Sequence, residues 1–348
     1  RLWKRTTPEQ GLTTFTYNAD DTLYQLKDAR NVIQIFNYNN RKLLTGLSYN
    51  VSGDTSGLTT PTANVSFAYD AAGHRTQMTD GLGSVSYSYN TLAQLTSETR
   101  TFAGLGSYTL SYAYDLGGQL LSLTNSVNGS QINYGYDQST RVSVVTGSGY
   151  GGVSTYAGSL RYRAWSGLKS LSYGNSRALA VSYDKRLRPS EWNIPGVMDW
   201  KYFYTHFNEN TGRVTYAQNM NDGTLDRSYD YDHVGRLIEA RTASEARGHL
   251  QGQGGTPDGP YAHSYRYDQM GNMWYRVGWG GWFNPWLEQW PSYVNNRLTT
   301  NPWTGASMSY DAAGNLTTDG YQTYTYDATG QQTSAGTMTQ SYDGDGLR

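Results

Sequence analysis

Short stretches of alternating apolar and polar residues recur along the chain, and each of them ends at a tyrosine. Three examples are Val65-Ser66-Phe67-Ala68-Tyr69, Val85-Ser86-Tyr87-Ser88-Tyr89 and Leu110-Ser111-Tyr112-Ala113-Tyr114. Successive side chains of a β-strand point to opposite faces, so a period of two predicts strands with two distinct faces. No amphipathic helical stretch of convincing length interrupts the series. The pattern therefore predicts an all-β chain.

A turn motif, Tyr-Asp-x-x-Gly-x-Leu, follows these alternating stretches. The Asp, or Asn in its place, can accept hydrogen bonds from nearby backbone N–H groups, and the Gly three residues later can take a positive φ. Leu or Val then begins the outgoing strand, so each motif predicts a β-hairpin. The residues that we assign to this structural repeat are Tyr69, Asp70, Gly73, Tyr114, Asp115, Gly118, Tyr231, Asp232, Gly235, Tyr267, Asp268, Gly271, Tyr310, Asp311, Gly314, Tyr326, Asp327 and Gly330.

Degenerate copies fill the gaps between the good ones, so that the motif recurs at steps of about 20 to 25 residues, the length of two strands and two turns. An open run of hairpins would leave two long strand edges exposed, and exposed edges promote aggregation. Winding the hairpins into one coiled sheet removes most of these edges. We therefore predict a spiral antiparallel sheet of repeated β-hairpins. Only 37% of the residues are hydrophobic, which predicts a hydrated interior lined by polar and aromatic side chains.

The repeated motif resembles the YD repeats of the Rhs family. Besides the copies above, the resemblance rests on Leu187-Arg188-Pro189 after Tyr183-Asp184, and on Tyr342-Asp343-Gly344-Asp345-Gly346-Leu347-Arg348. The family includes bacterial Rhs proteins, the C components of insecticidal Tc toxin complexes and the animal teneurins. The resemblance covers the chain from about Tyr17 to Arg348. It implies a spiral sheet that closes into a hollow shell, with residues 1–348 forming a YD-repeat shell segment.

The resemblance also implies a function. In bacterial members the shell encloses a toxic C-terminal segment, and in teneurins it is a cell-surface adhesion scaffold. We therefore expect a structural or interaction scaffold, secreted or at the bacterial cell surface, whose partner is its own C-terminal cargo domain or another protein outside this sequence. The aspartic-protease-like segment of toxin shells, with its Asp-Pro-x-Gly signature, is not present here. Because the chain begins at Arg1 and ends within a motif, we expect an excerpt of a longer protein.

Two segments depart from the repeat. Residues 243–260 have the composition of a loop insertion, with one helical turn expected at 243–247. Residues 274–303 form a Trp-rich irregular insertion that holds six of the ten tryptophans. These either fill the interior of a longer hairpin or form a sugar-stacking platform, a plug or a surface for a partner. The possible binding residues are Trp274, Trp279, Trp282, Trp286, Trp290 and Trp303.

Composition and charge exclude several classes of protein. The 27 Lys and Arg balance 28 Asp and Glu, so a nucleic-acid partner is not expected. The chain has no cysteine, which excludes thiol catalysis and Cys-ligated zinc, and no apolar stretch is long enough for a membrane span.

Candidate chemistry is equally sparse. The histidines lack metalloprotease spacing, and Asp343-Gly344-Asp345-Gly346 lacks the full ligand set of a calcium loop. We assign no catalytic residue, metal or cofactor. A glycan-binding surface adhesin and a polysaccharide-acting enzyme remain as alternatives.

Overall fold

A computed structural model describes residues 1–58, 62–149, 152–205, 212–247, 262–279 and 287–348. The chain divides into two compact units. Unit 1 comprises Arg1–Gly129 and Ser292–Arg348, and unit 2 comprises Ser130–Pro291. Strands dominate both units, and the described residues contain one short α-helix and one 3-10 turn. The predicted all-β fold of repeated antiparallel hairpins is thereby confirmed.

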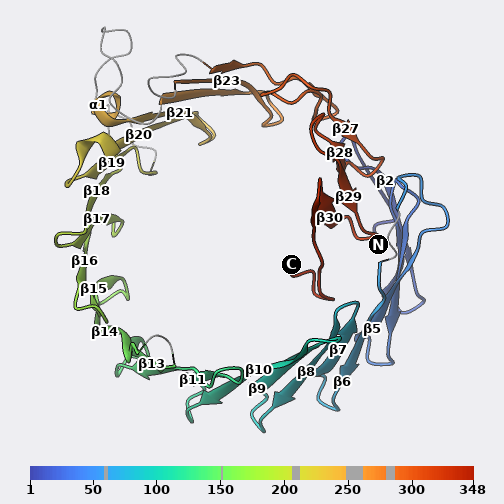
Figure 1. The fold of residues 1–348 in the computed structure, drawn as a ribbon, viewed down its shortest axis with the longest axis horizontal. Coiled ribbons are helices and arrows are strands. Elements are labelled where there is room, and N and C mark those ends of the chain that lie inside the picture. The colour runs from blue at the N-terminus through green and yellow to red at the C-terminus, as the bar shows by residue number, and fades with distance from the viewer. Residues whose placement is uncertain (59–61, 150–151, 206–211, 248–261, 280–286) are drawn as a thin grey trace. The chain divides into compact units, whose positions relative to one another are not determined.

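Unit 1 contains an N-terminal run of strands and a C-terminal run of shorter ones. The first run is β1 (Lys4–Thr7), β2 (Gly11–Tyr17), β3 (Leu23–Lys27), β4 (Ile33–Tyr38), β5 (Leu44–Asn50), β6 (Val65–Tyr69), β7 (Arg75–Asp80), β8 (Gly83–Tyr89), β9 (Leu95–Phe102), β10 (Gly106–Tyr114) and β11 (Leu120–Asn125). Each of these strands pairs antiparallel with the next along the chain (Figure 1). The second run is β25 (Tyr293–Val294), β26 (Arg297–Leu298), β27 (Ser309–Tyr310), β28 (Leu316–Thr318), β29 (Tyr324–Tyr326), β30 (Gln332–Ala335) and β31 (Met338–Thr339).

Unit 2 repeats the same antiparallel pairing between chain neighbours. Its strands are β12 (Gln131–Tyr136), β13 (Val142–Ser148), β14 (Thr155–Tyr162), β15 (Leu168–Tyr173), β16 (Ala178–Tyr183), β17 (Pro189–Ile194), β18 (Met198–Phe203), β19 (Tyr216–Asn219), β20 (Arg227–Tyr231), β21 (Leu237–Thr242), β22 (Ala262–Tyr267), β23 (Met273–Trp279) and β24 (Leu287–Gln289). The 3-10 turn η1 (Gly223–Leu225) and the helix α1 (Ala243–Ala246) also lie in this unit. Helix α1 occupies the helical turn expected at the start of the 243–260 insertion, whereas residues 248–261 lie outside the described residues.

Buried apolar side chains are few and scattered in the described part of the chain. The main cluster joins Val65, Met78 and Val85 on neighbouring strands β6, β7 and β8, with Phe67 and Tyr87 packed against it. Most strand residues are only half-buried. This distribution agrees with the expectation that no continuous oily core holds the repeats together, while the enclosed, hydrated interior stays a prediction.

The motif turns share one hydrogen-bonding pattern. In the first good copy, the Asp70 N–H donates to the carbonyl of His74 at 3.0 Å, and the Gly73 N–H donates to the carbonyl of Asp70 at 3.2 Å. A loop of three residues whose last member has a positive φ is one of the common hairpin connections. The φ values of the motif glycines lie between 86° and 98°, a region that suits glycine because it has no Cβ.

Degenerate copies place other residues in the same left-handed position. Ala93, Thr140, Ser166 and Leu187 have φ between 62° and 68°, and each donates its N–H to the carbonyl of the residue three positions earlier. The turn therefore forms without glycine, at the cost of a left-handed backbone that disfavours L-residues.

This cost predicts opposite effects at two turns of unit 2. Leu187 is half-exposed with φ 62°, so Leu187→Gly should stabilise the unit by up to about 1 kcal/mol, the left-handed penalty minus the extra chain entropy of glycine. Gly271 has φ 91° and open space where a Cβ would stand, so Gly271→Ala should destabilise it by about 1 to 2 kcal/mol. Denaturant unfolding measures both values, once circular dichroism and Trp fluorescence report one coincident transition. Equal stability of the two variants would show that the left-handed backbone at this turn position carries no energetic cost for an L-residue.

Candidate functional site

The motif tyrosines occupy equivalent places in their hairpins. In each one the strand register shifts immediately before the tyrosine, because the outgoing strand carries one extra residue, a β-bulge. In the β6–β7 hairpin, for example, Tyr69 pairs with Arg75 and Ala68 pairs with Gln77. The same shift precedes Tyr17, Tyr38, Tyr89, Tyr114, Tyr136, Tyr162, Tyr183, Tyr231, Tyr267, Tyr310 and Tyr326.

The tyrosine hydroxyl of one repeat bonds to the backbone of the repeat before it. The Tyr69 hydroxyl donates to the carbonyl of Leu44 at 2.8 Å, and Leu44 is the residue that pairs with the preceding motif tyrosine, Tyr38. Because a bulge lies directly after each such residue, its carbonyl stands where the regular ladder is interrupted. The same bond joins Tyr89 to Arg75, Tyr114 to Leu95, Tyr162 to Val142, Tyr183 to Leu168, Tyr204 to Pro189, Tyr231 to Val214, Tyr267 to Leu237, Tyr310 to Leu298 and Tyr342 to Gln332, at 2.7 to 3.0 Å.

An arginine four residues after the motif acid adds a second link between repeats in three places. Arg188 donates from Nε to the Asp184 carboxylate at 2.8 Å, and its guanidinium lies 3.8 Å from the centre of the Tyr204 ring in the next repeat. Arg141 and Arg236 make the same pair of contacts. Such cation–π contacts stabilise by about 0.5 to 2 kcal/mol. The motif Tyr-Asp-x-x-Gly-x-Leu leaves this position open, so it assigned these arginines no linking role, although Arg188 stands in the Leu187-Arg188-Pro189 copy and the spacing from the acid is constant.

The motif carboxylates are engaged within their own turns. The side-chain hydrogen bond from His74 lowers the pKa of Asp70, and the corresponding bonds from Arg141 and Asn272 lower the pKa of Asp137 and Asp268. A general acid at neutral pH needs a raised carboxyl pKa. These carboxylates have the opposite shift and serve as turn caps.

The structure brings together two of the six tryptophans that we named as possible binding residues. Trp274 and Trp290 lie in unit 2 with ring centroids 5.9 Å apart, and Tyr275 contacts both. Trp274 is 41% exposed and Trp290 is 61% exposed. Trp274 is the extra residue of the β22–β23 bulge.

Of the other four tryptophans, Trp303 is the one whose side chain the structure describes. Trp303 belongs to unit 1, where it is exposed on a turn closed by the Asn301 side chain. Trp279 ends β23, but its side chain lies outside the description. Trp282 and Trp286 lie outside the described residues altogether.

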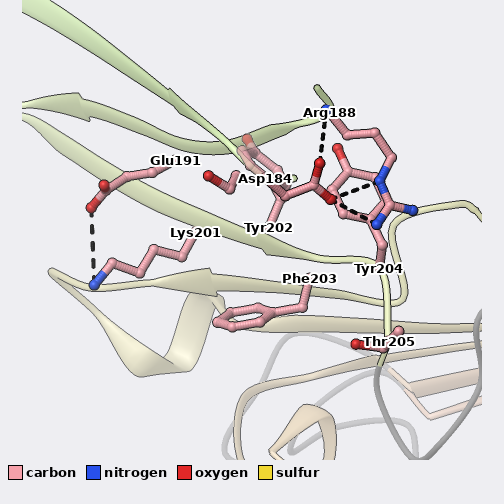
Figure 2. Close-up of a pocket in the computed structure, with 9 residues that line it drawn as sticks. Asp184, Arg188, Glu191, Lys201, Tyr202, Phe203, Tyr204 and Thr205 are labelled. Atoms are coloured by element: carbon pink, nitrogen blue, oxygen red, sulfur yellow. Dashed lines mark hydrogen bonds and ion pairs between the residues drawn. The ribbon is translucent and has the colours of Figure 1, made fainter. Parts of the chain in front are cut away.

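A surface groove of about 380 Å³ lies beside strands β17 and β18 of unit 2. Figure 2 shows Arg188 between Asp184 and Tyr204 at one end and the Glu191–Lys201 pair, 3.9 Å apart, at the other. The charged groups of the groove are thus paired with one another. Part of its wall is the Asp184–Arg188–Tyr204 link between repeats, and we assign the groove no separate chemistry.

Metal-binding clusters and membrane-spanning helices were two further kinds of candidate site. Within the described ranges, no three His, Asp or Glu side chains gather closely enough to hold a metal ion. None of the helices in these ranges is long and apolar enough to cross a membrane.

Comparison with known proteins places the fold. Residues 49–85 match the family model described as RHS Repeat, and no curated protein matches the chain in sequence. The solved structure of TcdB2-TccC3-TEV is 17% identical, with a TM-score of 0.77 over 99% of this chain and 19% of its own. TcdB2-TccC3 is also 17% identical, with a TM-score of 0.77 over 98% of this chain and 20% of its own.

The Photorhabdus luminescens Tc holotoxin pore with a TccC3 variant is a third match, 17% identical, with a TM-score of 0.74 over 98% of this chain and 18% of its own. The chain thus spans about a fifth of the length of these solved chains. The repeat match and the shared fold confirm the predicted resemblance to the Rhs and YD-repeat family.

If the tyrosine hydroxyl links neighbouring repeats, removing the hydroxyl alone should lower the stability of the protein. Tyr183→Phe keeps the ring but leaves the Leu168 carbonyl without its donor, which should lower the free energy of unfolding by about 1 kcal/mol. The matched control is Tyr321→Phe, because the Tyr321 side chain is 81% exposed, and this change should have an effect near zero. Denaturant unfolding of both variants checks the difference, and equal stability of the two variants would contradict the assigned role of the hydroxyl.

Proposed function

We propose that this chain of Rhs-type YD repeats is a structural scaffold, a segment of wall that encloses or presents another polypeptide. The observation that carries the proposal is the link between repeats. In the long runs of strands, successive hairpins are joined by strand pairing, and at most motif tyrosines the hydroxyl adds a bond to the preceding repeat, with little buried apolar volume among the described residues. Such an arrangement favours extended surfaces, as in other repeat proteins in which each unit contacts only its neighbours.

The similar solved structures support the same role. Their descriptions name TcdB2 together with TccC3 and a Tc holotoxin pore, and the fold of this chain matches them almost from end to end. By that likeness we propose that the partner is a polypeptide, either a cargo segment or another protein, and that the protein is secreted or presented at a bacterial cell surface. The motif carboxylates act as turn caps, which favours a scaffold over a polysaccharide-acting enzyme.

Small-angle X-ray scattering of the folded chain tests the wall-like role. A compact domain of this length would have a radius of gyration of about 20 Å. A wall built from one layer of hairpins should give a clearly larger value and a distance distribution shifted to long distances. A radius of gyration near the compact value, with a β-rich circular dichroism spectrum, would contradict the proposal.

A glycan-binding adhesin is the second candidate, favoured by the exposed Trp274 and Trp290 rings, which both contact Tyr275. Aromatic faces of this kind provide large contact area with little loss of side-chain entropy. In this case the sugar would stack on the indoles of Trp274 and Trp290, and Trp303 would take no part in the site.

A glycan array distinguishes the two candidates. If the cluster binds sugar, the parent chain should bind at least one glycan class, and Trp274→Ala with Trp290→Ala should abolish the signal. Trp165→Ala is the control, because Trp165 is a similarly exposed indole of unit 2 outside the cluster. No binding by the parent chain, or binding that survives the double substitution, would eliminate the adhesin.

A further inference from the structure

The C-terminal strip, residues 292–348, contacts the N-terminal strands of unit 1 through its motif turns. Its motif tyrosines, Tyr310, Tyr326 and Tyr342, stand 16 residues apart, closer than the 20 or more residues that separate the other motif tyrosines. In the region of the first turn, Arg297 donates from Nε to the carbonyl of Glu9 at 2.7 Å. At the second, the buried Arg30 donates to the carbonyls of Asp327 and Ala328 at 3.0 and 3.2 Å.

The third turn, Asp343–Leu347, has a more specific docking site, which we call the socket: Val65, Arg75, Met78, Asp80 and Arg100. The Asp80 side chain is 2% exposed and is held by Arg100 in a two-point ion pair of 2.7 and 2.8 Å. Its Oδ2 also accepts a hydrogen bond from the Gly344 N–H at 2.8 Å. A buried carboxylate is stable only when its oxygens are satisfied, so the third turn completes this site.

Arg75 provides a second anchor in the socket. Its guanidinium lies over the rings of Phe67 and Tyr87, at 5.5 and 4.9 Å from their centroids, and donates to the Tyr87 hydroxyl. Held in this way, it makes two parallel bonds of 2.7 Å to the Asp345 carboxylate. Fork-to-fork pairing of this kind is strong and geometrically selective.

Gly344 fits the socket because it has no side chain. A Cβ at this position would lie 2.6 Å from Cγ1 of Val65 and 2.9 Å from Sδ of Met78, both members of the main apolar cluster. Its backbone is outside the left-handed region, so close approach, and not φ, excludes a larger residue. No other good copy of the motif has Gly-Asp after the Tyr-Asp pair.

We infer that the Gly344-Asp345 pair is a docking element that locks the C-terminal strip onto strands β6 to β9 and covers the Val65–Met78–Val85 cluster. This assignment accounts for the Asp343-Gly344-Asp345-Gly346 sequence. Asp343 caps the turn, and Asp345 pairs with Arg75. The lock adds to the anchors at the first two turns, and its Gly-Asp sequence occurs in the third turn alone among the three.

Charge reversal tests the lock. In Arg75→Asp and in Asp345→Arg, hydrogen exchange of peptides covering 338–348 should accelerate by about tenfold or more, the loss expected for a charged hydrogen-bonded pair. The double variant restores opposite charges and should return exchange to near the parent rate. Asp345→Asn, which nearly preserves the shape, keeps the test informative should the reversed variants fail to fold.

Gly344→Val provides an independent test of the close approach. It should accelerate exchange in the same peptides, whereas the control Gln269→Val, at the same position of an exposed turn in unit 2, should leave them unchanged. Parent-like exchange in Asp345→Asn and Gly344→Val, or failure of the double reversal to restore protection while the single variants lose it, would overturn the inference.

Discussion

The hydrogen bond from a motif tyrosine hydroxyl to the backbone carbonyl of the preceding repeat is the interaction on which the rest of the structure depends. Two features accompany it in most copies. A β-bulge interrupts the ladder beside the acceptor, and the next strand ends on a tyrosine in the matching register. Both follow from the motif, because the turn fixes the register and the extra residue falls at the same offset in every copy. The hairpins are thereby fixed to one another.

A sheet built in this way has little need of a deep core. Among the described residues of unit 1, the buried apolar side chains are a small cluster around Met78 and isolated residues such as Val32 and Ala328. Stability comes from ladders, hydroxyl links and Arg–Asp–Tyr contacts between adjacent repeats. Nearest-neighbour stabilisation of this kind suits a wall whose two faces both remain partly exposed. It also tolerates imperfect turns, such as the one with Leu187 in the left-handed region, because each defect affects mainly its own repeat.

The sequence predicted the hairpins well because their determinants are local. Alternation ending at Tyr69, and Asp70 and Gly73 after it, determine strand and turn within a few residues. The links between repeats were less visible, since the acceptor carbonyls belong to residues such as Leu44 and Leu168 whose side chains carry no signal. Contacts over long sequence separations, such as Arg30 with Asp327 and Arg75 with Asp345, depend on where the C-terminal strip lies and could not be predicted. The tryptophans were grouped by sequence proximity, but the structure divides Trp290 and Trp303 between the two units.

The central claim is that the repeats are held by links to their neighbours and not by a shared core. Native-state hydrogen exchange, measured strand by strand in the parent chain and in a variant that lacks one motif hydroxyl, tests it most directly. For Tyr183→Phe the account predicts faster exchange in β14 to β18, with protection elsewhere in the chain unchanged. Uniform acceleration across all the strands would show one cooperative core and would contradict the account.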